Sequence, residues 1–217
     1  MRGWYAVFGM VMAAVAGAQH APGPWEVRRC RTSDAEKAGG FPQWEVTFSG
    51  RSETADVHIR EESGTSRGVI FVGQRVRVPE EDTLELRFSF RTSCALEHRS
   101  GAVHLYVFSP EAWDRLGKNT DTPVIDGADE RARPLWRLQL HHMSEPDVVE
   151  PQEVPETARQ ALAGYLRTQI GQEVILAVAW LGAHTSPEQA DILGLQIRRV
   201  APPDPCVALM EFLDFER

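Results

Sequence analysis

Strict alternation of apolar and polar side chains between residues 83 and 92 constrains the fold more than any other feature of the sequence. The apolar members of this stretch are Leu84, Leu86, Phe88 and Phe90, and the polar ones are Glu85, Arg87, Ser89 and Arg91. A period of two residues is that of a β-strand with one face in a core and the other in solvent. The stretch therefore predicts a sheet with one apolar and one polar face.

Further short stretches of this kind predict an all-β protein. The expected strands cover residues 45–48, 55–61, 68–72, 74–78, 83–92, 102–108, 135–142, 173–181 and 192–200. Clusters of glycine, serine, threonine and proline separate them, which is typical of a β-sandwich. Two segments have helical character instead. One or two turns are expected at 110–116, and a helical insertion at 155–168, where one face carries Ala158, Ala161, Leu162, Tyr165 and Leu166.

The N-terminal segment has the features of a secretory signal peptide. Arg2 precedes an apolar stretch over residues 4–16, and Ala16-Gly17-Ala18 supplies small residues for cleavage before Gln19. The stretch is shorter than the roughly 20 apolar residues that span a bilayer, although an uncleaved anchor is the alternative. We expect a signal peptide over 1–18, one β-sandwich domain over 19–201 and a C-terminal tail over 202–217. Such a protein would be secreted, periplasmic or extracellular, without stable membrane insertion.

Charge and motifs exclude several classes of function. The chain has 31 acidic and 23 basic side chains, a net charge of −8, which argues against nucleic acid as a partner. The sequence has no G-x-S-x-G elbow, no H-E-x-x-H and no Walker or Rossmann glycine pattern. It also lacks an E-x-D-x-E run, the form that paired carboxylates of glycosidases would take on one strand. We therefore expect a protein that is not an enzyme.

Four stretches carry a resemblance to a known family. They are GVIFVGQRVRVPEEDTLELRFSFRT (68–92), GAVHLYVF (101–108), EVILAVAWLG (173–182) and ADILGLQIRRV (190–200). Their order of strands and turns resembles that of non-catalytic carbohydrate-binding modules of the galactose-binding-like jelly-roll type. The resemblance implies a jelly-roll β-sandwich that binds a polysaccharide without cleaving it. The chain departs from the family in a longer 110–170 region, and the usual N-terminal acidic calcium ligand has no counterpart.

Polar side chains on the central strands form the candidate binding site. If these strands share a sheet, one surface would carry Arg87, Arg91, His104, Tyr106, Arg137 and His141, together with Ser89 and Gln139. Arginine offers planar, bidentate hydrogen bonds that suit acidic or hydroxyl-rich sugars, and an aromatic ring can stack on a sugar. The alternative is the solvated outer face that antiparallel sheets commonly have.

The tryptophans divide between core and surface. Trp44, Trp136 and Trp180 are expected in the core from their position along the strands. Trp113 lies outside the strands, where it would either serve as an exposed stacking platform or cover the core beneath a long loop.

Asp191 and the cysteines raise two further expectations. Asp191 opens the last strand, where the resemblance implies a structural calcium ligand, and an aspartate that merely begins a strand is the alternative. Cys30 and Cys206 flank the domain, and because chain termini often lie close together we expect them to form the disulfide if there is one. Cys94 is expected to be a small buried residue.

The expected function is that of a secreted, non-catalytic polysaccharide-binding module. One alternative is an envelope or extracellular structural or protein-interaction module, which would bind a protein partner through the apolar and acidic segment at 207–215 of the tail. Another is a small polysaccharide hydrolase or lyase built from scattered carboxylates.

Overall fold

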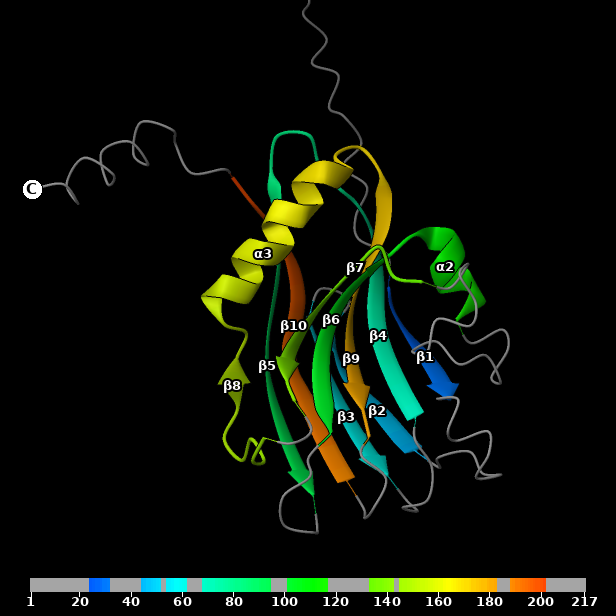
Figure 1. Ribbon diagram of the computed structural model, residues 1–217, viewed down its shortest axis with the longest axis vertical. Coiled ribbons are helices and arrows are strands. Elements are labelled where there is room, and N and C mark those ends of the chain that lie inside the picture. The colour runs from blue at the N-terminus through cyan, green and yellow to red at the C-terminus, as the bar shows by residue number, and fades with distance from the viewer. Residues whose placement is uncertain are drawn as a thin grey trace, which may run out of the picture.

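Two antiparallel five-stranded sheets form the described part of the chain (Figure 1). The computed structural model describes residues 24–31, 44–51, 54–61, 68–94, 101–116, 133–142, 145–182 and 188–201. In spatial order the first sheet contains β1 (Trp25–Arg31), β4 (Gly68–Arg77), β9 (Glu173–Leu181), β6 (Ala102–Phe108) and β7 (Trp136–His141). The second contains β2 (Trp44–Arg51), β3 (Thr54–Glu61), β10 (Glu188–Val200), β5 (Thr83–Cys94) and β8 (Gln152–Glu153). Along the chain, β4, β5 and β6 alternate between the sheets, as do β9 and β10.

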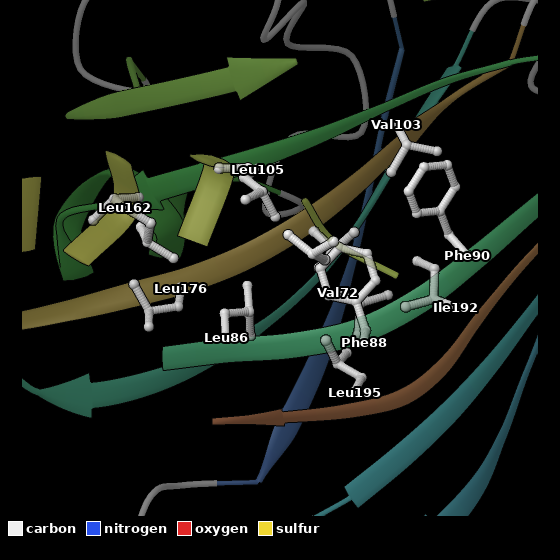
Figure 2. Packing of buried hydrophobic residues seen from close by; sticks show 14 of the residues in the cluster. Val72, Leu86, Phe88, Phe90, Val103, Leu105, Leu162, Leu176, Ile192 and Leu195 are labelled. Carbon is white, nitrogen blue, oxygen red and sulfur yellow. The ribbon is translucent and has the colours of Figure 1, made fainter. Parts of the chain in front are cut away.

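The main core lies between the two sheets. The alternating apolar residues of β5 meet those of β6 and β9 there, and Figure 2 shows this packing. Ala158, Leu162 and Leu166 of helix α3 (Glu156–Leu166) are buried in the same cluster. Because α3 contacts both β5 and β7, it closes the sandwich on the side where β7 ends the first sheet and the two-residue strand β8 flanks β5 in the second. A short 3-10 turn, η2 (Arg167–Gln169), follows it.

A second apolar cluster covers the outer face of the first sheet. Helix α2 (Pro110–Arg115) begins after Ser109, whose hydroxyl accepts a hydrogen bond from the Ala112 amide at 3.1 Å. The helix places the Trp113 ring, which is 1% exposed, against Phe71 and Phe108. The Trp113 Nε1 donates to Glu26 Oε2 at 3.0 Å. This cluster makes the outer face of the first sheet apolar near α2.

The structure confirms the predicted all-β sandwich with a helical insertion. The predicted helices at 110–116 and 155–168 correspond to α2 and to α3 with η2. Residues 68–77, predicted as two strands, form the single strand β4, and β1 and β8 were not predicted. The expected signal peptide at 1–18 and tail at 202–217 lie outside the described residues. Within the described part, no helix is long and apolar enough to cross a membrane.

Candidate functional site

The polar residues predicted to share one surface belong to two different sheets. Arg87 and Arg91 lie on β5 in the second sheet, whereas His104, Tyr106 and Arg137 lie on β6 and β7 in the first. All five alternate with core residues, so they occupy the outer faces of opposite sheets. The prediction of a single combined surface is therefore wrong. Alternation shows which side chains share a face of a strand, but not the sheet to which the strand belongs.

Tyr106 is buried rather than exposed. Its side chain is 5% exposed and its ring lies 5.3 Å from Phe71 and 5.5 Å from Phe108, centroid to centroid. Burial raises the pKa of the Tyr106 hydroxyl, although the charge of Arg137 acts to lower it. The ring of His104 stacks on Tyr106 at 5.9 Å. The expectation of an exposed Tyr106 ring is wrong, because this ring belongs to the second apolar cluster, which lies beneath helix α2.

His104 is held in its neutral form on this face. Burial, and after it the charges of Arg137 and His142, lowers the pKa of His104 to about 4. Arg137 lies opposite Tyr106 on β7 and is exposed, as is Gln139 opposite His104. A small polar area therefore remains beside the buried aromatic rings.

His141 lies on the core side of β7, which corrects its placement on the polar face. The register of β7 against β6 shifts between His104, paired with Gln139, and Val103, paired with His141. One extra residue in β7 turns His141 to the same side as the buried Val103. Its ring lies 6.3 Å from Phe90, and its Nδ1 lies 2.9 Å from the Glu145 carboxylate. Burial lowers the pKa of His141 despite the nearby charges of Glu145 and Asp147.

On the outer face of the second sheet, Asp191 is the centre of a charged cluster. Its register partners are His58 on β3 and Arg91 on β5. His58 Nδ1 lies 2.7 Å from one carboxylate oxygen, Arg91 Nε donates to the other, and Gln189 Nε2 donates at 3.2 Å. Burial acts to raise the pKa of Asp191, but the hydrogen bonds from His58 and Arg91 outweigh it and lower the pKa. We call these four residues the Asp191 cluster.

The contacts of Asp191 can be compared with those that the expected calcium site would need. Asp191 is completely buried, and its oxygens already accept hydrogen bonds from an arginine, a histidine and an amide. Calcium prefers six to eight oxygen ligands. Among the described residues, no three His, Cys, Asp or Glu side chains gather as a metal would require. Calcium at Asp191 stays a prediction to which these contacts give no support.

An open pocket of about 260 Å³ lies on the same face. Residues of β5, β8, β10 and α3 line it, and we call it the β5–α3 pocket; its lining residues are Arg87, Phe88, Ser89, Glu153, Val154, Arg159, Leu193, Gly194 and Gln196. Ser89 and Arg91 are two residues apart on β5, about 7 Å along a strand. The pocket and the Asp191 cluster are therefore neighbours on the outer face of the second sheet.

A β-bulge in β10 shapes one side of this pocket. The register of β10 shifts against both β3 and β5 between Ile192 and Gln196. Gly194 in the bulge has a φ of +64°, a backbone conformation that glycine adopts without strain. The Gly194 amide donates to Asp56 Oδ1 at 2.7 Å, which anchors the bulge to β3.

Glu85 organises the two arginines of the pocket. Its carboxylate accepts from Arg87 Nε at 2.8 Å and from Arg159 Nη1 at 2.7 Å. Burial acts to raise the pKa of Glu85, but these hydrogen bonds outweigh it and lower the pKa. The hydrogen bond with Glu85 in turn raises the pKa of Arg87. Both guanidinium groups are thus fixed in place by one carboxylate.

The remaining expectations have mixed outcomes. Trp113 covers the apolar cluster on the first sheet, so of the two alternatives the covering role is confirmed. Trp180 is fully buried and Trp136 packs against the core, as predicted, whereas the side chain of Trp44 lies outside the described part.

Cys30 is a buried free thiol and not part of a disulfide in the structure; Cys206 lies outside the described residues.

Several site residues were missed by the sequence interpretation. His58, Gln189, Glu153, Arg159 and Gln196 all lie on this surface. The available signal was alternation, which places His58 on the outer face of its strand. It could not show that β3, β10 and β5 are neighbours, or that α3 reaches the border of the sheet.

Comparisons with known proteins found similarity in structure but not in sequence. No family model and no curated protein sequence matches it. In structure it is similar to TmCBM61, solved in complex with β-1,4-galactotriose, with 8% identity and a TM-score of 0.35, covering 76% of this chain and 94% of that one. It is similar to the family 11 carbohydrate-binding module of the cellulosomal cellulase Lic26A-Cel5E of Clostridium thermocellum, with 8% identity, a TM-score of 0.36 and coverage of 82% and 88%.

A third similar structure is TmCBM27, a carbohydrate-binding module described for specific mannan recognition. It has 11% identity and a TM-score of 0.30, and the match covers 81% of this chain and 99% of that one. At these scores the likeness assigns neither a ligand nor a binding surface to this chain. These three solved structures are carbohydrate-binding modules.

Proposed function

We propose that this protein is a secreted, non-catalytic module that binds a polysaccharide on the outer face of its second sheet. One observation carries the proposal. The Asp191 cluster and the β5–α3 pocket are neighbours on one sheet face, and together they present arginine, histidine, glutamine and serine side chains. Sugar hydroxyls both donate and accept hydrogen bonds, so they match a surface that offers both.

Internal ion pairs prepare this surface for a ligand. Asp191 fixes His58 and Arg91, whose side chains are 35% and 46% exposed, and Glu85 fixes Arg87 in the same way. A side chain that is already ordered loses less conformational entropy when a ligand binds. The charged groups therefore act as fixed hydrogen-bonding partners rather than as mobile surface charges.

The outer face of the first sheet suits this role less well. Helix α2 and Trp113 cover much of it, and Tyr106 is buried beneath the same cluster. On β6 and β7, His104, Arg137 and Gln139 form a small polar area beside this cluster. Binding at the second sheet is the better supported choice.

Affinity electrophoresis tests the proposal directly. The protein is run through native gels that contain soluble polysaccharides of different composition, with serum albumin as a non-binding control. Retardation in at least one gel is expected, without release of reducing ends from the same polysaccharide. Free migration in every gel would contradict binding, and release of reducing ends would contradict the non-catalytic role. N-terminal sequencing of the secreted protein should begin at Gln19.

A further inference from the structure

We infer that the β5–α3 pocket takes a single uncharged sugar ring, either a side branch or a chain end of a neutral polysaccharide. The inference rests on the proposed function and adds the class of ligand and the mode of recognition. Its basis is the shape, the charge and the hydrogen-bonding capacity of the pocket.

The shape of the pocket favours a single ring over a continuous chain. Its volume of about 260 Å³ is below the range of roughly 300–1,000 Å³ of pockets for drug-sized ligands. Glu153 of β8, Arg159 of α3 and Val154 between these elements supply one wall, on the β8 side of β5. A long linear chain that lies flat across the strands would meet this wall, whereas a ring that projects from the chain could enter.

The charge around the pocket disfavours an acidic sugar. Two cationic side chains, Arg87 and Arg159, line the pocket together with the carboxylate of Glu153. Both arginines are already paired with Glu85, and Arg159 also pairs with Glu156. Three carboxylates therefore surround two guanidinium groups, so the carboxylate of an acidic sugar would be attracted only weakly. A neutral sugar is not repelled by the excess negative charge.

The remaining hydrogen-bonding groups match hydroxyls. Arg87 uses its Nε for Glu85, which leaves its Nη groups as donors. The Gln196 side-chain oxygen accepts from Arg198 at 2.8 Å, so the amide nitrogen is its remaining donor. Ser89 both donates and accepts, and the exposed Glu153 carboxylate accepts. A sugar ring presents both kinds of partner on adjacent carbons.

One buried atom of the pocket lining also lacks a partner. Arg159 Nε is inaccessible to solvent and has no hydrogen-bond partner among the described residues. The two outer nitrogens of this side chain are both engaged with carboxylates. The guanidinium is therefore fixed as part of the wall, and the ligand is recognised by Arg87, Gln196, Ser89 and Glu153.

A pair of matched substitutions on β5 tests the pocket. Ser89→Trp fills it, whereas Thr83→Trp places the same side chain on the same face at the start of β5, opposite Val200 and outside both the lining residues and the Asp191 cluster. A milder variant, Gln196→Ala, removes one donor, and Gln169→Ala on η2 is its control. All variants are run in gels containing galactomannan or xyloglucan (neutral, branched), lichenan (neutral, unbranched), and polygalacturonate or alginate (acidic). Thermal unfolding confirms that each is folded.

We expect the wild type to be retarded most by the branched neutral polysaccharides, because every branch offers a ring. Ser89→Trp should abolish this retardation and Gln196→Ala should weaken affinity roughly tenfold, while both controls bind as the wild type does. Wild-type retardation that survives in Ser89→Trp and Gln196→Ala would overturn the pocket and leave the proposed function standing. Retardation only by acidic polymers would overturn the neutral ligand, and retardation by lichenan equal to that by branched polymers would overturn single-ring recognition. Wild-type migration unaffected by every gel would refute the proposed function itself.

Discussion

Asp191 on β10 and His58 on β3 face each other across the second sheet, with a carboxylate oxygen of Asp191 2.7 Å from His58 Nδ1. Arg91 completes the row from the other side, on β5. A buried carboxylate at the centre of an outer sheet face holds the exposed side chains around it. Asp191 thus acts as a positioning residue for His58 and Arg91.

Replacing Asp191 should destabilise the fold. Asp191→Asn keeps the shape but removes the charge from the hydrogen bonds with His58 and Arg91, at a cost of about 1–3 kcal/mol at pH 7. Urea unfolding measures the free energy of unfolding of the wild type and of each variant. Asp82→Asn, in the loop before β5, is the control, and an equal loss in both variants would contradict the role of Asp191.

The same ion cluster predicts a response to acid. Because the pKa of Asp191 is lower in the folded state than in the unfolded state, the unfolded chain takes up this proton first as the pH falls. The stabilisation from Asp191 is present above about pH 4 and is lost below it. The difference in unfolding free energy between wild type and Asp191→Asn should therefore shrink from pH 7 to pH 3.

Two glycines should respond to alanine in opposite directions. A Cβ at Gly73 would lie 2.6 Å from Trp113 Cη2 and 2.9 Å from Ile175 Cγ2, so Gly73→Ala should cost about 1–3 kcal/mol through overpacking beneath α2. A Cβ at Gly164, inside α3, would meet no atom within 4 Å, so Gly164→Ala should stabilise by about 0.5–1 kcal/mol. Thermal unfolding compares them; an unaffected Gly73→Ala would contradict the packing of Trp113.

Protonation of His104 should lower the free energy of unfolding at a higher pH than protonation of Asp191 does. Its pKa is about 4 in the folded state against an ordinary 6.5. Between about pH 6.5 and pH 4 the unfolded state binds more protons, so stability decreases as the pH drops. His104→Gln should flatten this slope in urea unfolding at pH 7, 5.5 and 4.5. The slope should not vanish, because the pKa of His141 is lowered as well. An unchanged slope would refute the assignment.

Cys30 should be chemically inert in the folded protein. Burial raises the pKa of its thiol to about 12, although Arg28 acts to lower it, and the thiolate is the reactive form. Iodoacetamide at pH 8 followed by peptide mapping should leave Cys30 unmodified until guanidinium is added. Modification under native conditions, or a peptide in which Cys30 is linked to Cys206, would contradict a buried free thiol.

The sequence predicted the fold better than the site. The alternating apolar residues from Leu84 to Phe90 are all buried in the main core, as predicted. Most strands lie where the periodicity of the sequence predicted them. Strand β8 has only two residues, Gln152 and Glu153, which is too short for a periodic signal. The break expected near Gly73 is absent, because this glycine lies beneath Trp113 instead of in a turn.

The site depended on long-range neighbours that periodicity cannot show. Arg87 and Arg137 have equivalent positions in their own strands but lie in different sheets. His141 departs from alternation because of a single extra residue in β7. The pairing of Asp191 with His58 joins residues 133 positions apart, and it exists because β10 lies between β3 and β5.

Amide chemical shifts would test most directly which face binds. A ¹H–¹⁵N correlation spectrum of the labelled protein is recorded during titration with an oligosaccharide from a retarding polysaccharide. We expect shifts centred on Arg87–Arg91 of β5 and Gln189–Gln196 of β10, with little change around His104, Tyr106 and Arg137. Shifts centred on β6 and β7, with β5 and β10 unaffected, would place the ligand on the first sheet and contradict binding at the second.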